Sequence, residues 1–414
     1  MKKIVISILL FITAFFCDSA ARAADIDIVS KAEWTVMIYM NGDNDLDACV
    51  YNDMTEIEKI GSNSAVNIIV QADRAKKTAR RYIVRKNDGT IKNDDWGLVS
   101  ECLSDVGEVD MGDYKEFVNF FDWGIKNYPA EKYALIIWNH GTGWKRTHYD
   151  GKSISFDDTS KNAITTVQLG IALEKMKKIS GKKLDLLIMD ACLMQMIEVL
   201  AEIQNSVDFV CASEDIEPNG GMPYETPFKF LTETPNCNSR EFAGVIVKCF
   251  HDKYYAPRGE NSTFYTYSAV DCSKINDFML SFKNLTTGIA NSMNTNSSNA
   301  QAMAYIRKNV QRYSFRDYAD IGDMLKFMKS GLKSDNSLAG LIDETLKRYN
   351  KLIVANVCGG VNVANSTGIS IYIPNYAIKS HYKFLKFNQT GWTDFLTKIF
   401  GLNYIDSKPD SQMY

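Results

Sequence analysis

The stretches YALIIWNHGTG (133–143) and LDLLIMDAC (184–192) decide the fold. The first begins with a continuous apolar run and the second with a run interrupted only by Asp185, as expected for buried strands, and each then leads into polar or reactive residues. Between them, residues 165–179 have helical periodicity, and Gly181 follows as a helix terminator. A strand, a helix and a second strand in this order predict a right-handed crossover, which makes the two strands parallel and close together in one sheet.

Short apolar runs and amphipathic stretches alternate on both sides of this unit. The pattern predicts an α/β fold with a mostly parallel central sheet and helices on both faces. No composition shift marks a boundary, so we expect a single domain over 24–414, with a sheet core at about 33–275 and a C-terminal part at about 276–414. Further strands are expected at 35–40, 66–72, 209–213, 264–270 and 369–374, a hairpin at 81–89, and helices at 44–60, 113–128 and 193–203.

The first 23 residues have the pattern of a signal peptide. Two lysines precede an apolar run, and Ala21-Arg22-Ala23 matches the small-x-small site that signal peptidase cleaves. We therefore expect an exported protein, periplasmic or extracellular. Cys17 suggests a lipoprotein anchor, but the bulky Phe16 before it argues against processing there. No later segment reaches about 18 uncharged apolar residues, so we expect no transmembrane segment.

Charge and cysteine usage exclude several other classes. The 47 Lys and Arg residues nearly balance the 50 Asp and Glu residues, and no basic block exceeds two residues, which argues against nucleic acid as a partner. The chain has nine cysteines but only four histidines, and it lacks a C-x-x-C motif. We therefore predict no zinc or other metal site, and a redox function of the thiols is disfavoured.

Two reactive residues follow the deciding strands. Sites in parallel sheets form at the carboxyl ends of the strands, where His140 and Cys192 are expected to lie together. Such a pair supplies a nucleophile and a proton donor, and the backbone N–H groups of Gly141 and Cys192 are candidates for an oxyanion hole. Since a helix is expected over 193–203, its N-terminus should lower the pKa of the Cys192 thiol. The spacing alone leaves a purely structural role for both residues open.

The sequence resembles the clostripain family of cysteine peptidases, within the caspase, legumain and gingipain clan. The resemblance implies a caspase-like sandwich with His140 and Cys192 as the catalytic dyad, and this dyad requires no third orienting residue. The matching stretches run in the family's order over nearly the whole mature chain: WTVMIYMNGDNDLD (34–47), IIWNHGTGW (136–144), LLIMDACLMQMIEVLAE (186–202), ASEDIEPNGGMPY (212–224), YSAVDCSK (267–274), FRDYADIGDML (315–325) and GISIYIP (368–374).

Some members of the resembled family use calcium, which leaves calcium open for this chain. Asp43, Asp45 and Asp47 alternate as the acids of a calcium loop do. However, Met54 stands where such a loop needs a bidentate glutamate. The three aspartates are better explained as acids of a first helical turn, where negative charge stabilises the helix N-terminus.

The resemblance also implies cleavage after Arg or Lys. Asp190 lies two positions before Cys192, so both side chains leave an extended strand on one face, and a carboxylate there can bind a substrate cation. Alternatively, Asp190 caps the next helix or orders a loop. Glu214 and Asp215, after the next strand, are the next candidates, and they are equally plausible as loop-ordering acids.

Members of the resembled family cut themselves between the two deciding strands. Here residues 145–162 are polar and longer than an ordinary strand-to-helix connection. We expect cleavage after Lys152, before Ser153, with Lys161 and Arg146 as the next choices. The fragments should stay associated, because the cut separates neighbouring strands of one sheet.

The sequence therefore predicts a monomeric, secreted cysteine endopeptidase that acts on proteins or peptides with Arg or Lys before the scissile bond. One alternative is a transpeptidase or ligase that uses the same dyad. Another is a secreted binding protein that kept the fold and lost activity, although the intact His140, Cys192 and Asp190 count against it.

Overall fold

A nine-stranded sheet organises the chain in the computed structural model, which describes residues 31–144, 153–255, 264–293, 296–333 and 335–405. The strands of this sheet are β1 (Ala32–Gly42), β2 (Val66–Arg74), β3 (Ala79–Ile83), β4 (Glu101–Gly107), β5 (Ala130–Trp138), β8 (Leu184–Asp190), β9 (Val207–Ala212), β10 (Tyr265–Asp271) and β12 (Ile353–Gly359). Their order is β12-β10-β9-β8-β5-β1-β2-β3-β4. The strands from β9 to β2 pair parallel, and antiparallel strands extend both edges. The predicted mostly parallel centre is confirmed.

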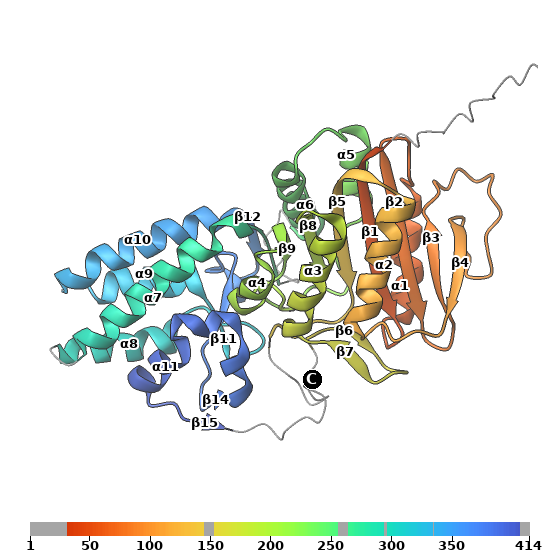
Figure 1. The fold of residues 1–414 in the computed structure, drawn as a ribbon. Helices are drawn as coiled ribbons and strands as arrows, with labels where there is room; N and C mark the ends of the chain where they lie inside the picture. Colours follow the sequence, from red (N-terminus) through yellow and green to blue (C-terminus); the bar gives the residue numbers. More distant parts are fainter. Residues whose placement is uncertain (1–30, 145–152, 256–263, 294–295, 334, 406–414) are drawn as a thin grey trace, which may run out of the picture. The chain divides into compact units, whose positions relative to one another are not determined.

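Helices cover both faces of this sheet (Figure 1). In β1, Met37 and Tyr39 face a core shared with α2, α3 and α4, whereas Val36, Ile38 and Met40 face a core shared with α1, α5 and α6. This alternation is the period of an extended strand, and it explains why the central strands are apolar on both sides. The helices are α1 (Asp47–Glu58), α2 (Tyr114–Asn127), α3 (Thr166–Ser180), α4 (Ile197–Ile203), α5 (Glu225–Glu233), α6 (Ser239–Tyr254), α7 (Ile275–Ser292), α8 (Ser297–Asn309), α9 (Ile321–Gly331), α10 (Asn336–Leu352) and α11 (Trp392–Phe400).

The predicted crossover between β5 and β8 is confirmed. Thr165 caps α3 in a capping box with Gln168, and Gly181 ends the helix with φ 72°. β5 and β8 pair parallel, with Trp138 opposite Asp190 at their carboxyl ends. The local signals of this segment therefore set the register on which the candidate site depends.

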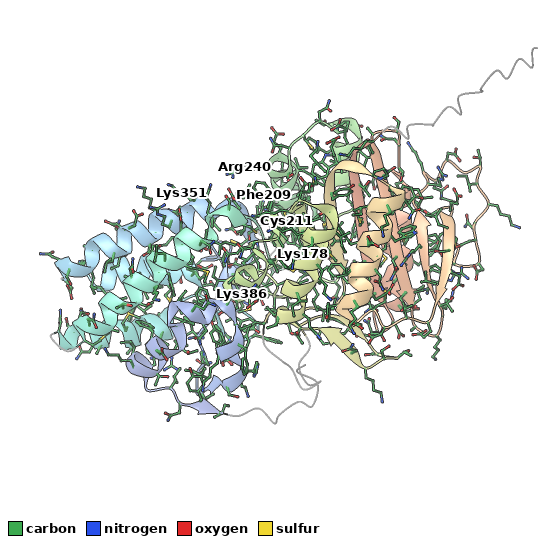
Figure 2. All side chains as sticks on the ribbon, in the orientation of Figure 1. Lys178, Phe209, Cys211, Arg240, Lys351 and Lys386 are labelled. Carbon is green, nitrogen blue, oxygen red and sulfur yellow. The ribbon has the colours of Figure 1, made fainter. Side chains whose placement is uncertain are left out.

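The C-terminal helices gather beside the β12 end of the sheet (Figure 1). Lys386 joins this part to α4, because its Nζ donates to the Glu202 carbonyl oxygen at 2.9 Å (Figure 2). Cys211 on β9, also labelled in Figure 2, is buried against α6 as a small apolar residue. The smaller strands are β6 (Ile154–Asp157) with β7 (Asn162–Ile164), β11 (Tyr318–Asp320) with β13 (Ser370–Tyr372), and β14 (Ile378–Lys379) with β15 (Tyr404–Ile405).

The strand predicted at 369–374 is confirmed as β13, which pairs with β11. Two local predictions are wrong. The strand expected at 81–85 does not form a tight hairpin at 87–89, since β3 pairs with the distant β4. The helix expected from residue 193 begins at Ile197. Among the described residues, no helix is both long and apolar enough to cross a membrane.

Candidate active site

The sheet register brings the His140 and Cys192 segments together. Trp138 pairs with Asp190, and the Asn139 N–H donates to the Asp190 carbonyl oxygen at 3.2 Å, so each candidate residue lies two positions beyond a paired one. Gly141 lies so close that an added Cβ would be 2.3 Å from the Cys192 carbonyl oxygen. Only glycine permits this approach, and the two loops are therefore in direct contact.

An irregular loop, rather than a helix, follows Cys192. Leu193 has φ 67°, which is unusual for a branched residue, and its N–H donates to the Asp215 carbonyl oxygen at 3.0 Å. The Gln195 N–H donates to the Ser213 carbonyl oxygen at 2.9 Å, so the segment after β9 holds this loop in place. Because α4 begins only at Ile197, the predicted helix N-terminus next to the Cys192 sulfur is absent.

The surroundings of Cys192 favour a neutral thiol. Burial raises its pKa to about 12, and the nearby Glu217, Asp190 and Asp215 carboxylates act in the same direction. The Glu217 N–H opposes this effect by donating to the Cys192 sulfur at 3.3 Å. The pKa shift predicted from the sequence thus has the wrong sign for the intact chain without substrate.

His140 contacts Asp45, an acid for which the sequence predicts a place in a first helical turn. Its Nε2 lies 2.6 Å from Asp45 Oδ1, and the two side chains are 41% and 81% exposed. The Phe156 ring lies edge-on to the imidazole at 6.4 Å between ring centroids. Asp45 lies in the β1–α1 loop, and nothing in the sequence of that loop predicts the contact. The contact also depends on the conformation of the loop after β5, which carries His140.

Asp190 is buried at the end of β8 and orders the loop before α5. Its carboxylate accepts hydrogen bonds from the Met222 N–H at 3.0 Å and from the Tyr224 hydroxyl at 2.7 Å. Lys253 Nζ in turn donates to the Met222 carbonyl oxygen at 3.3 Å. The loop-ordering alternative for Asp190 is therefore present in the structure, and it does not conflict with a role next to Cys192.

The sequence does not single out Glu217, a buried acid close to Cys192. Its carboxylate is buried beside Asp190, and neither oxygen has a hydrogen-bond partner of good geometry among the described residues. Burial, followed by the Asp190 charge, raises the pKa of Glu217 well above its ordinary value. Asp53 on α1 extends this group, because burial and Asp190 raise its pKa to about 7. Glu217 follows Glu214 and Asp215 in the sequence, and no periodicity shows which of the three faces the thiol.

Glu214 and Asp215 make contacts typical of loop-ordering acids. Glu214 accepts a hydrogen bond from the Tyr313 hydroxyl at 2.8 Å, and this hydroxyl also lies 3.0 Å from Asp320 Oδ2. Asp215 Oδ1 accepts from the Ser314 N–H at 2.8 Å. Both residues thus connect the segment after β9 to the C-terminal part of the chain.

The three alternating aspartates do not form a calcium site. Asp43 accepts from the Thr159 N–H, Asp45 contacts His140, and Asp47 forms a bidentate ion pair with Arg74. Within the described ranges, no three His, Cys, Asp or Glu side chains are grouped to hold a metal ion. These residues therefore do not fit the calcium ion used by some members of the resembled family.

Of the predicted cleavage positions, only Lys161 lies within the described residues, and Arg146 and Lys152 lie outside them. Lys161 is exposed, with φ 52°, in the turn between β6 and β7. Ser153 is buried, and its hydroxyl donates to the Gly143 carbonyl oxygen. The Thr142 N–H also donates to the Ser153 carbonyl oxygen at 2.9 Å, so the residues that flank 145–152 are joined to each other.

The fold resembles solved structures of cysteine proteases. The X-ray structure of a secreted C11 cysteine protease from Bacteroides thetaiotaomicron, in complex with an irreversible peptide inhibitor, matches with a TM-score of 0.69 and 17% identity, over 88% of this chain and 99% of that one. An inactive zymogen C11 protease from Parabacteroides distasonis matches with a TM-score of 0.64 and 18% identity, over 87% and 98%. The predicted caspase-like α/β class is confirmed.

Sequence comparison gives the same relationship. Clostripain from Hathewaya histolytica is 25% identical over 229 residues, which are 50% of this chain and 44% of that protein, so the match spans less than half of this relative. The sequence profile of the clostripain family matches residues 38–399, from β1 to α11. The chain therefore belongs to the clostripain family.

Proposed function

We propose that this chain is an exported cysteine endopeptidase that cleaves peptide bonds after Arg or Lys through His140 and Cys192. The observation that carries the proposal is the contact between the two loops, in which Gly141 packs directly on the Cys192 carbonyl group. The shared register of β5 and β8 supports it, because it holds both residues at the same edge of the sheet.

The reaction follows from the chemistry of the two side chains. His140 accepts the thiol proton as the Cys192 sulfur forms a bond to the substrate carbonyl carbon. As the C–N bond breaks, the imidazolium returns this proton to the leaving amine, and a thioester remains on Cys192. Water then hydrolyses the thioester. We assign stabilisation of the carbonyl oxygen to the backbone N–H groups of Gly141 and Cys192.

Asp190 and Glu217 are the proposed binding groups for the substrate cation. Two neighbouring buried carboxyl groups cannot both ionise readily, whereas a guanidinium or ammonium group between them would stabilise both charges. Glu217 supports this role most directly, since it has no good hydrogen-bond partner among the described residues and its own N–H contacts the nucleophile. Glu214 and Asp215 have structural partners instead, so we place them second.

Self-cleavage within 145–162 remains part of the proposal, with Lys152, Lys161 and Arg146 as its positions. The structurally similar Parabacteroides distasonis protein is described as an inactive zymogen, which supports a precursor form. The bonds between Ser153 and the Gly143 segment lie outside residues 145–152. A cut among those residues would leave both new ends attached, and we expect two fragments on a denaturing gel but one species in gel filtration.

The experiment that tests this function uses a panel of fluorogenic peptides that differ only in the residue before the scissile bond. We expect cleavage after Arg and Lys, and loss of all cleavage in His140→Ala and in Cys192→Ala. Activity that survives either substitution would refute the dyad. Equal cleavage after Ala or Asp would refute the specificity while leaving the peptidase assignment standing.

A further inference from the structure

We propose that Asp45 is a positioning residue for His140, and that it leaves Nδ1 as the ring nitrogen that exchanges the proton with Cys192 and the leaving amine. This inference rests on the proposed dyad. It adds a third group, because the side chain of Asp45 contacts the imidazole at 2.6 Å on Nε2.

The backbone on each side of this contact is fixed by one residue, Phe156 of β6. Asn139, which directly precedes His140, accepts a hydrogen bond from the Phe156 N–H at 2.8 Å. Asn44, which directly precedes Asp45, donates to the Phe156 carbonyl oxygen at 2.7 Å. Two loops that are distant in sequence are thus held on the same residue, Phe156, and the contact between His140 and Asp45 follows from that arrangement.

Further bonds fix the loop that carries Asp45. Asn41 Nδ2 donates to the same Phe156 carbonyl oxygen at 3.0 Å, and Asp43 Oδ2 accepts from the Thr159 N–H at 3.0 Å. The Leu46 N–H donates to Asn44 Oδ1 at 2.9 Å, so the residues on both sides of Asp45 form hydrogen bonds. The carboxylate is exposed, but its backbone is not free to move away from His140.

The chemistry of the contact assigns the ring nitrogens. An ionised carboxylate only accepts hydrogen bonds, so the Nε2 atom that faces Asp45 carries a hydrogen, and Nδ1 remains for proton exchange. When His140 holds the thiol proton, the Asp45 charge stabilises the imidazolium and keeps the ring oriented. An exposed pair of this kind contributes little to folding stability, so its removal tests orientation rather than the fold.

Kinetics on two leaving groups distinguish this role from a structural one. In Asp45→Asn, we expect kcat for a Lys peptide amide to fall by about 10- to 100-fold, within the range of general acid catalysis, with little change in KM. A Lys p-nitrophenyl ester should lose clearly less than the amide, because its leaving group departs as an anion and needs no proton, so only the transfer of the thiol proton to His140 is affected. Asp45→Glu, which restores a carboxylate, should recover part of the amide activity.

Asp158→Asn is the matched control. Asp158 is an exposed acid in the turn after β6, so this variant also removes one negative charge from that region, and both activities should stay at the parent level. Equal loss on amide and ester, or parent-like amide turnover in Asp45→Asn, would each overturn the inference. Full activity of His140→Ala alone would instead refute the dyad.

Discussion

His140 and Cys192 occupy equivalent positions beyond neighbouring strands, but their surroundings are opposite. The imidazole is exposed and contacts one exposed acid, Asp45. The thiol is largely buried among Glu217, Asp190 and Asp215. The register of the sheet therefore determines where the two residues lie, whereas loops from other strands determine which groups each side chain contacts. The following four predictions test this difference, from the largest expected effect to the smallest.

Removal of the Cys192 thiol should have the largest effect. Cys192→Ala should lower peptide cleavage by at least about 10³-fold, because the attacking atom is lost. The melting temperature should change little, since the deleted atom is small. Cys102→Ala, which removes an exposed thiol from β4, is the control and should keep the parent activity. Measurable turnover by Cys192→Ala would mean that another group attacks the substrate.

Separation of the two loops should have the next largest effect. In Gly141→Ala, the new Cβ would lie 2.3 Å from the Cys192 carbonyl oxygen, so at least one loop must move. Because a displacement of about 1 Å at a reacting centre costs roughly 100-fold, kcat should fall by about that factor. The control is Gly244→Ala in α6, where an added Cβ meets nothing within 4 Å. If both variants keep full activity, the loop contact is not needed for catalysis.

Changes at the buried acids should affect one class of substrate. Glu217→Gln keeps the shape and removes the charge, so kcat/KM for Lys and Arg peptides should fall by about tenfold or more. Slow cleavage of a peptide with a neutral residue at that position should not fall. Asp190→Asn should show the same selectivity, but it also disturbs the bonds to Met222 and Tyr224, so its melting temperature must be compared. An equal loss of kcat/KM on both substrates would mean that the Lys or Arg side chain of the substrate binds at another site.

The smallest effect concerns the thiol itself. With the pKa of Cys192 at about 12, its alkylation by iodoacetamide should be slow at pH 8 and should still increase at pH 10, where an ordinary cysteine has reached its plateau. Butylguanidinium should accelerate alkylation by a few-fold, because a cation beside Glu217 and Asp190 lowers this pKa, at about tenfold per unit. In Glu217→Gln, butylguanidinium should accelerate the alkylation of Cys192 less than in the parent protein. Rapid alkylation that is flat above pH 8 would contradict this account.

Local signals were sufficient for the elements that carry His140 and Cys192. Thr165 and Gly181 mark the ends of α3, and the apolar runs mark β5 and β8, so the positions of His140 and Cys192 followed from the sequence. The start of α4 could not be predicted from the sequence. The hydrogen bonds from Leu193 and Gln195 to the segment after β9 replace the helical turn that was expected there. These bonds join residues that are far apart in the sequence, and no propensity encodes them.

The contacts of the acids were also beyond sequence reasoning. Asp45 reaches His140 because Asn44 and Asn139 both bond to Phe156, a residue of a third segment. Glu217 does not stand out beside Glu214 and Asp215 in the sequence. In the structure, the N–H of Glu217, unlike those of the other two acids, donates to the Cys192 sulfur. In both cases the local sequence shows an acid, and only the packing of distant loops shows what that acid touches.

The bond between Ser153 and Gly143 has a practical consequence for protein engineering. The residues on either side of 145–152 are held together by the contacts of Ser153 with Gly143 and Thr142, so we expect that the length of this span can be altered without moving β5 or β6. Doubling the length of a loop costs only about 0.6 kcal/mol in closure entropy. If cleavage in this span activates the chain, as proposed, a recognition sequence for an unrelated protease spliced into it would place that activation under the control of a chosen second enzyme.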